Sequence, residues 1–175
     1  MPHFRLKHSG YTLVELMVAL AAGAFLLSGV SLAYSAIKGT VLVGKELENA
    51  QEVIRYTSKV FTRSIKQTPV IPTVSADGLS ITVTQSAGVV TCAGSVAVAD
   101  VNETYQLDAN NLMCALGGLP SERLLTGIES LNFSINNDLI TIKVKPEHLP
   151  AHFGAAVTIE LAASNVILER VYSGG

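Results

Sequence analysis

The chain has 175 residues, of which 49% are hydrophobic and 15% are charged, and it contains two Cys and no Trp. This composition is too apolar for an intrinsically disordered chain and too poor in Cys for a small protein held together by disulfides. The net charge of −2 is unevenly distributed, because residues 67–175 carry four basic and ten acidic side chains. We therefore expect no direct binding of nucleic acid by this region, since such binding depends on Lys and Arg.

The first predicted element is an apolar helix. From Leu16 to Ile37 there is no Asp, Glu, Lys, Arg or His, and 22 helical residues at about 1.5 Å each span the roughly 30 Å hydrocarbon core of a bilayer. The basic residues before the helix predict a cytoplasmic N-terminus and export of the rest. A cleavable secretory signal is an alternative, but the run is longer than such signals use, and no A-x-A site followed by a polar start closes it.

An acidic residue, Glu15, stands at the cytoplasmic edge of this run. A carboxylate without a partner in lipid costs several kcal/mol, so such a residue usually has a partner or a function. One interpretation is that Glu15 lies among the lipid headgroups and favours the helix N-terminus. The other follows from the residues around it.

The string from Gly10 to Leu20, GYTLVELMVAL, resembles the class III signal of type IV prepilins. The resemblance implies cleavage by a prepilin peptidase after Gly10, which is the last leader residue, and N-methylation of the new N-terminal residue, Tyr11. Tyr replaces the usual Phe at that position and keeps its aromatic character. It also implies that the carboxylate of Glu15, the fifth mature residue, pairs with the N-terminal amine of a neighbouring subunit, so that both charges are neutralised.

Beyond Ile37 the apolar residues recur at helical spacing, at Val43, Leu47, Ala50, Ile54, Phe61 and Ile65, which predicts one long helix from Thr12 to Lys66 that ends before Pro69 and Pro72. Arg55, Lys59 and Arg63 follow one another at four-residue spacing on the other face. They form either a solvated helix face or a contact with the acidic head of a neighbouring subunit.

Strands are predicted from residue 78 onward, where polar and apolar residues alternate. The segments are Leu79–Thr84, Leu131–Ile135, Ile140–Lys145, Val157–Leu161 and, as a closing edge strand, Ile167–Tyr172, with a further hairpin of Tyr105–Leu107 and Leu112–Cys114. Asn136, Asn137 and Asp138 predict a turn between two of them. The expected fold is α+β and type IV pilin-like, with a long N-terminal helix packed on an antiparallel β-sheet head.

Two segments of this region, Leu125–Phe133 and Phe153–Ile159, resemble the heads of PilW-type minor pilins and of J-class pseudopilins of type II secretion systems. The absence of Pro between Ser28 and Tyr34 favours either of these over a major pilin, which usually has one there. Cys92 and Cys114 lie 22 positions apart. In an exported head we expect them to pair, although two buried thiols are an alternative.

The sequence contains no recognisable catalytic motif, so we do not expect an enzyme, and we expect no cofactor. His148 and His152, with Glu147, have a spacing that binds metals on helices, but Pro150 between them argues against a helix, and we expect no metal site.

The hypothesis from sequence is a minor pilin that initiates or caps a type IV pilus. Its parts would be a leader (1–10), a transmembrane or filament-core helix (11–37), an amphipathic helix (38–66) and a periplasmic head (67–175). The resemblance implies a precursor that crosses the inner membrane once and then moves to the extracellular pilus, at its tip. It implies as partners other minor pilins, the major pilin, prepilin peptidase and an inner-membrane assembly platform. The alternatives are a J-class pseudopilin and a monomeric membrane-anchored periplasmic binding module.

Overall fold

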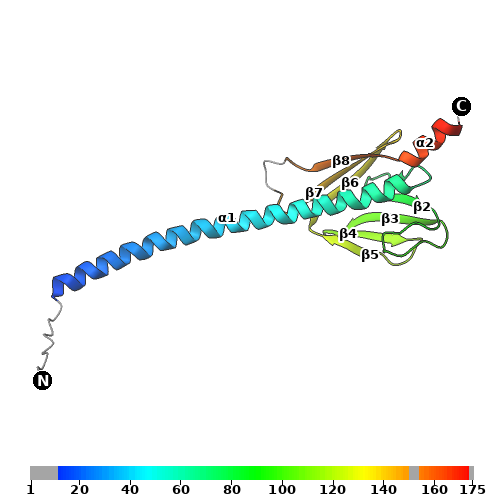
Figure 1. The fold of residues 1–175 in the computed structure, drawn as a ribbon. Coiled ribbons are helices and arrows are strands. Elements are labelled where there is room, and N and C mark those ends of the chain that lie inside the picture. The colour runs from blue at the N-terminus through cyan, green and yellow to red at the C-terminus, as the bar shows by residue number, and fades with distance from the viewer. Residues whose placement is uncertain (1–11, 150–153, 174–175) are drawn as a thin grey trace, which may run out of the picture. The chain divides into compact units, whose positions relative to one another are not determined.

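The computed structural model describes residues 12–149 and 154–173, and they fall into two compact units, residues 1–44 and 45–175. Helix α1, Leu13–Gln67, contributes residues to both units (Figure 1). In the first unit, the described residues are almost all exposed. The predicted helix limits, Thr12 and Lys66, each differ from the observed ones by one residue.

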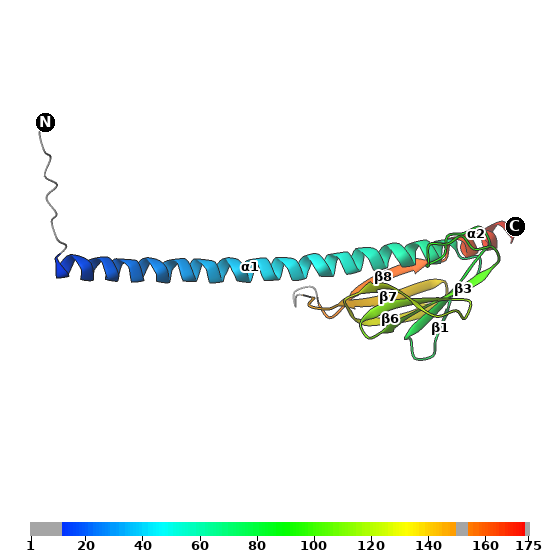
Figure 2. The ribbon, with the colours of Figure 1, turned by 90° about the horizontal axis from the view of Figure 1, so that it is seen from below.

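The second unit contains two antiparallel sheets beside the C-terminal half of α1, which lies along them in both views (Figures 1 and 2). The first sheet has the order β1-β2-β3-β4-β5 and the second the order β6-β7-β8. Their strands are β1 Thr73–Val74, β2 Ser80–Gln85, β3 Val101–Asp108, β4 Asn111–Leu116, β5 Glu122–Thr126, β6 Ile128–Asn136, β7 Leu139–Pro146 and β8 Val157–Ala162. The expected α+β fold, a long apolar helix against antiparallel strands, is confirmed, although the strands form two sheets instead of one.

Short hairpins connect two pairs of strands, β3 with β4 and β6 with β7. β3 and β4 are joined by Ala109 and Asn110, both with positive φ, and Tyr105 pairs with Cys114 across the hairpin. β6 and β7 are joined by Asn137 and Asp138, with φ of 55° at Asn137. Positive φ at the first loop residue gives a turn whose twist matches that of the flanking strands.

A single hydrophobic core joins α1 to both sheets. Phe61 is fully buried and makes edge-on ring contacts with Tyr105 of β3, at 5.1 Å between ring centroids, and with Phe133 of β6, at 5.4 Å. Buried residues of α1 recur every three or four positions, from Ala50 through Val53, Thr57, Val60 and Phe61 to Ser64 and Ile65. Val43, which the sequence pattern placed on the packed face, is 58% exposed, so packing begins near Leu47.

The predicted edge strand Ile167–Tyr172 is wrong, because these residues belong to helix α2, Ser164–Ser173. The Ile167 amide donates to the Ala163 carbonyl at 3.2 Å, which closes the first turn. Ala163 is buried and Val166 packs against the core, a spacing of three that suits a helix. Leu168, Glu169 and Arg170 are good helix formers, and they outweigh the β-branched residues that suggested a strand.

Candidate functional site

The start of α1 carries the residues for which the sequence predicts a function. Thr12 caps the helix, since its hydroxyl oxygen accepts from the Glu15 amide at 3.3 Å and its carbonyl accepts from the Leu16 amide at 3.2 Å. This role of Thr12 was not predicted from the sequence, although the spacing Thr-x-x-Glu is a known signal for a helix N-terminus. Gly10 and Tyr11 lie outside the described residues.

The carboxylate of Glu15 is exposed in the first turn of α1. An acidic side chain there is favoured by the partial positive charge of the helix N-terminus. Among the described residues, no hydrogen bond or ion pair involves this carboxylate. Glu15 is therefore available to a cation outside the described part of the chain.

Apolar side chains cover the first unit of α1 on all sides. The helix is long and apolar enough to cross a membrane, and none of the residues in its most apolar 18-residue stretch is buried. More than half of each large apolar side chain is accessible, at Leu13, Val14, Leu16, Met17, Val18, Leu20, Phe25, Leu26, Leu27, Val30, Leu32, Tyr34, Ile37, Val41, Leu42 and Val43. A helix with no polar face requires an apolar environment such as lipid or neighbouring helices.

The three basic residues proposed for a subunit contact are in different environments. Arg55 and Lys59 are exposed. Arg63 is half-buried and donates a hydrogen bond from its guanidinium to the Thr91 carbonyl at 3.4 Å. Within the described ranges, Arg55 and Lys59 make no hydrogen bond or ion pair, whereas Arg63 has a contact within its own chain.

A buried carboxylate connects α1, two strands and the disulfide loop. Glu103 on β3 is 1% exposed and accepts hydrogen bonds from the Ser64 hydroxyl at 2.7 Å, the Tyr105 hydroxyl at 2.8 Å and the Gln85 amide at 3.1 Å. Its other oxygen accepts from the Cys92 amide at 2.6 Å. Burial, together with the negative charge of Glu103, raises the pKa of the Tyr105 phenol. Because Glu103 has partners on all sides, the cluster holds these segments together and is closed to a ligand.

Cys92 and Cys114 form a disulfide, with 6.5 Å between their Cα atoms. This link fixes the segment after β2 to the centre of β4. It agrees with the pairing expected for an exported head, and it leaves no free thiol in the chain.

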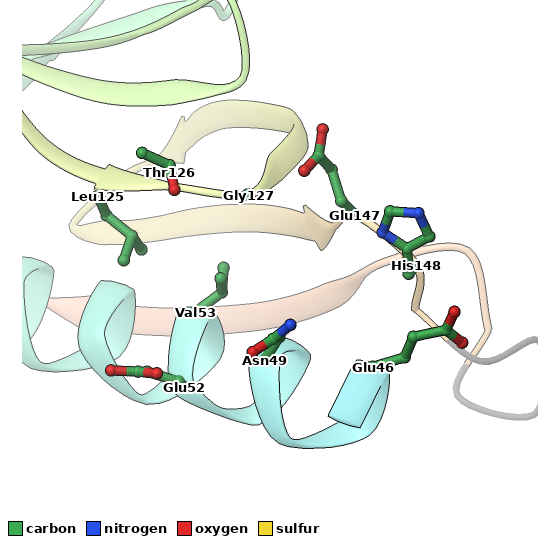
Figure 3. Close-up of a pocket in the computed structure, with 9 residues that line it drawn as sticks. All are labelled: Glu46, Asn49, Glu52, Val53, Leu125, Thr126, Gly127, Glu147 and His148. Atoms are coloured by element: carbon green, nitrogen blue, oxygen red, sulfur yellow. The ribbon is translucent and has the colours of Figure 1, made fainter. Parts of the chain in front are cut away.

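A pocket of about 430 Å³ lies between α1 and the strand ends (Figure 3). Its charged residues are acidic, with Glu46 and Glu52 on α1 and Glu147 after β7, and His148 stands at its rim. No three His, Cys, Asp or Glu residues in the described ranges are arranged to hold a metal ion. His152 and Pro150 lie outside those ranges.

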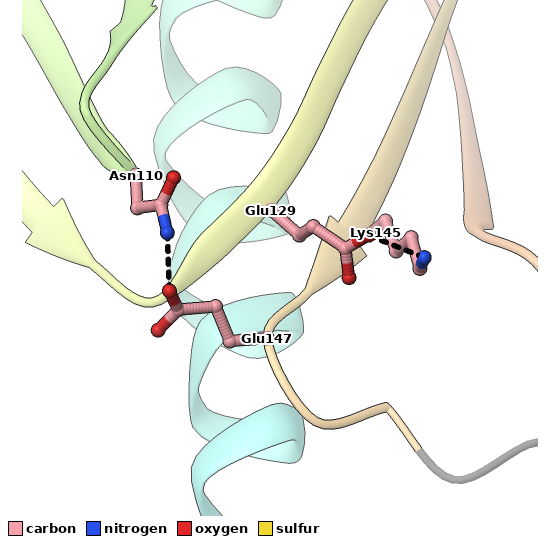
Figure 4. A network of polar contacts seen from close by, with 4 residues as sticks. All are labelled: Asn110, Glu129, Lys145 and Glu147. Carbon is pink, nitrogen blue, oxygen red and sulfur yellow. Dashed lines mark hydrogen bonds and ion pairs between the residues drawn. The ribbon is translucent and has the colours of Figure 1, made fainter.

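Asn110 in the β3–β4 turn and Gly127 between β5 and β6 hold the wall of this pocket, and Figure 4 shows the contact of Asn110 with Glu147. The Asn110 side-chain amide donates to the Glu147 carboxylate, and the Asn110 carbonyl accepts from the Gly127 amide at 3.0 Å. Gly127 has a φ of +90°, and a Cβ atom there would lie 3.6 Å from Val53 on α1. Nearby, Lys145 pairs with Glu129 at 2.6 Å. Glu147 therefore has a structural partner, and the described residues that line the pocket show no arrangement of nucleophile and base.

Comparison with known proteins supports a function for the N-terminal segment. Residues 5–31 match a family model described as the prokaryotic N-terminal methylation motif. The match includes Gly10, Tyr11 and Glu15 and supports a type IV pilin-like or pseudopilin precursor, a structural class of protein, with processing by prepilin peptidase and membrane anchoring. No curated protein and no solved structure matches the chain.

Proposed function

We propose that this chain is the precursor of a minor pilin of the PilW type, which initiates or caps a type IV pilus. The observation that supports this proposal best is the methylation motif over residues 5–31, at the start of an apolar helix that no other described part of the chain covers. A helix of this kind is suited to storage in a membrane and then to packing among identical helices in a filament.

In this proposal the N-terminal residues take part in three successive steps: cleavage, methylation and assembly. Prepilin peptidase cuts after Gly10 on the cytoplasmic side, and the new amine of Tyr11 is methylated. The amine remains cationic and meets the Glu15 carboxylate of a neighbouring subunit. Two opposite charges in an apolar bundle stabilise assembly only when they are paired, so this contact fixes the position of each subunit.

The rest of the chain forms an exported head that acts by assembly and not by catalysis. Its acidic balance is suited to contacts with proteins, such as other minor pilins and the major pilin, and not with nucleic acid. The disulfide between Cys92 and Cys114 is consistent with folding in the oxidising periplasm. The inner-membrane platform would then move the subunit from the membrane into the pilus, where it occupies the tip.

The test is the mass of the N-terminal peptide of the membrane-associated protein in cells with and without prepilin peptidase. The expected result is a peptide that begins at N-methylated Tyr11 and is absent from cells that lack the peptidase. An N-terminus at Met1 in both strains would overturn the proposal. Recovery of the processed chain with secretion-system pseudopilins, and not with sheared pili, would refute the pilus assignment.

A further inference from the structure

The segment between β2 and β3 contains a small hairpin, residues 88–97, which we call the disulfide hairpin. Val90 and Val96 pair as an isolated antiparallel bridge, and the Thr91 amide donates to the Ser95 carbonyl at 2.8 Å. These bonds fold the hairpin on itself and do not attach it to the sheets. Its attachment depends instead on contacts that reach other elements.

Three contacts attach the disulfide hairpin to other elements, and they meet at two neighbouring residues. The guanidinium of Arg63 on α1 donates to the Thr91 carbonyl at 3.4 Å. The Cys92 amide donates to the carboxylate of Glu103 on β3 at 2.6 Å, and the Cys92 sulfur is bonded to Cys114 on β4. The covalent link therefore holds the Cys92 amide against the Glu103 carboxylate.

The Glu103 carboxylate connects the disulfide hairpin to the last turn of α1. Its second oxygen accepts from the Ser64 hydroxyl at 2.7 Å and from the Gln85 amide at 3.1 Å, and the Gln85 amide also donates to the Ser64 carbonyl at 3.0 Å. All three side chains are 1% exposed. Burial of a carboxylate is favourable only while its donors stay in place, since each lost donor leaves charge without a partner. Loss of the Cys92 amide from one oxygen therefore weakens the packing of the groups around the other.

We propose that the disulfide and Glu103 together form a redox-sensitive latch on the C-terminal end of α1. A dithiol reductant supplies two electrons and two protons, so that the sulfur–sulfur bond breaks, Cys92 and Cys114 become thiols, and the dithiol closes to its own disulfide. The disulfide hairpin then loses its covalent attachment, water reaches Glu103, and residues 63–67 loosen from the sheets. This device lies within the head, so it goes beyond the proposed function and does not depend on entry of the chain into a filament.

The latch must act in both directions. If the disulfide favours docking of the end of α1 by some factor, docking of α1 favours the disulfide by the same factor. Ser64 bonds to neither cysteine, yet removal of its hydroxyl should make the disulfide easier to reduce. A residue that stabilises the oxidised and the reduced head equally would not have this effect.

Hydrogen exchange of the full-length, detergent-solubilised chain tests the first direction. Reduction with dithiothreitol, verified by the mass of the two free thiols, should speed amide exchange about tenfold in the disulfide hairpin and at residues 63–67, because a hydrogen bond to a buried charge is lost. Residues 128–146 in the other sheet should be unaffected. Faster exchange in the hairpin alone, or in no segment, would overturn the latch. Faster exchange in all three segments would show general unfolding and would overturn it as well.

Glu103→Gln tests whether the carboxylate carries the coupling, because it removes the charge and keeps the length of the side chain. In this variant, reduction should change exchange at residues 63–67 by less than about twofold, since the charged acceptor that joins the hairpin to α1 is absent. A response as large as that of the unsubstituted chain would exclude Glu103 as the link.

Equilibration with reduced and oxidised glutathione tests the reverse direction and does not need the Glu103 variant to fold. Ser64→Ala should lower the equilibrium constant for the disulfide about tenfold, measured as the alkylated thiol fraction by mass, since one donor to the carboxylate is lost. Thr104→Val is the matched control, because the Thr104 hydroxyl bonds to Thr82 at 3.1 Å and not to Glu103. It should leave the constant unchanged. Equal constants in the unsubstituted chain and both variants would refute the coupling.

Discussion

At the scale of single residues, the burial of Glu103 could not be predicted from the sequence pattern. Glu103 stands in the alternating segment Val101–Asp108, and nothing in its neighbours marks it as buried. Its burial follows from the parity of the strand, since Glu103 and Tyr105 face the same side as the core. The four donors that satisfy its carboxylate come from α1, β2, β3 and the disulfide loop. Such a set is assembled only by the tertiary fold.

Tyr105 should make the stability of the protein depend on alkaline pH. Its raised folded pKa means that the unfolded chain, with a phenol pKa of about 10, releases this proton first. The stabilisation is complete below pH 10 and is lost as the pH rises further, with a slope of up to about 1.4 kcal/mol per pH unit. Urea unfolding of the detergent-solubilised chain between pH 8 and 11.5 measures this slope.

Tyr105→Phe should reduce the alkaline slope, because the shifted group is gone. Tyr172→Phe is the matched control, since Tyr172 is 83% exposed, and it should leave the slope unchanged. Equal slopes in all three proteins would contradict the role assigned to Tyr105.

The candidate site was predictable in part from single residues. The spacing around Gly10, Tyr11 and Glu15 is local, so it can be recognised without a fold, and the family match falls on the same residues. The contact of Arg63 with Thr91 joins residues 28 positions apart. The four-residue spacing of the basic residues therefore indicated the exposed positions of Arg55 and Lys59, but not the contact that Arg63 makes within its own chain.

At the scale of elements, β2 and β7 were predicted well, β1 and β5 were not predicted, and the C-terminal helix was predicted as a strand. β2 and β7 alternate strictly between more and less buried residues, and each was predicted to within one residue at either end. α2 is short and combines β-branched with helix-forming residues. This segment is helical because Ala163 and Val166 pack against the core. Local propensity carries no information about that packing.

The disulfide should contribute substantially to the stability of the head. In the chain-entropy model, a link across 22 residues stabilises the folded state by about 3 kcal/mol. Cys92→Ser with Cys114→Ser should therefore lower the free energy of unfolding by about that amount, as measured by urea unfolding. Reduction of the unsubstituted chain with dithiothreitol serves as the control and should produce the same loss. A change below about 1 kcal/mol would show that the fold around Glu103 constrains this loop without the link.

At the scale of the whole molecule, the chain combines two units with opposite solvent requirements. Residues 45–175 bury their own core, whereas the described part of residues 1–44 leaves its apolar side chains uncovered. The sequence indicates this contrast directly, because the first unit is apolar on all sides and the second alternates. What covers the first unit is a property of the assembly, and neither propensity nor spacing in one chain specifies it.

Glu15 should be required for assembly and dispensable for folding. Its carboxylate is exposed and has no partner among the described residues, so Glu15→Gln should leave the urea unfolding of the head unchanged. The variant should still be processed, but its amount in sheared filaments should fall at least tenfold, because the amine of the neighbour is left unpaired in an apolar bundle. Glu122→Gln, an exposed acidic residue of β5, is the control. Normal amounts of the Glu15 variant in filaments would refute the pairing.

The loop enclosed by the disulfide has a consequence for proteolysis. Val98 is fully exposed between β2 and β3, in a segment of small residues that an elastase-like protease can enter. A cut there falls between Cys92 and Cys114, so the two fragments remain covalently joined. β3 stays paired with β2 and β4, and the nicked head can keep its shape. A cut of this kind would become visible only after the protein is reduced.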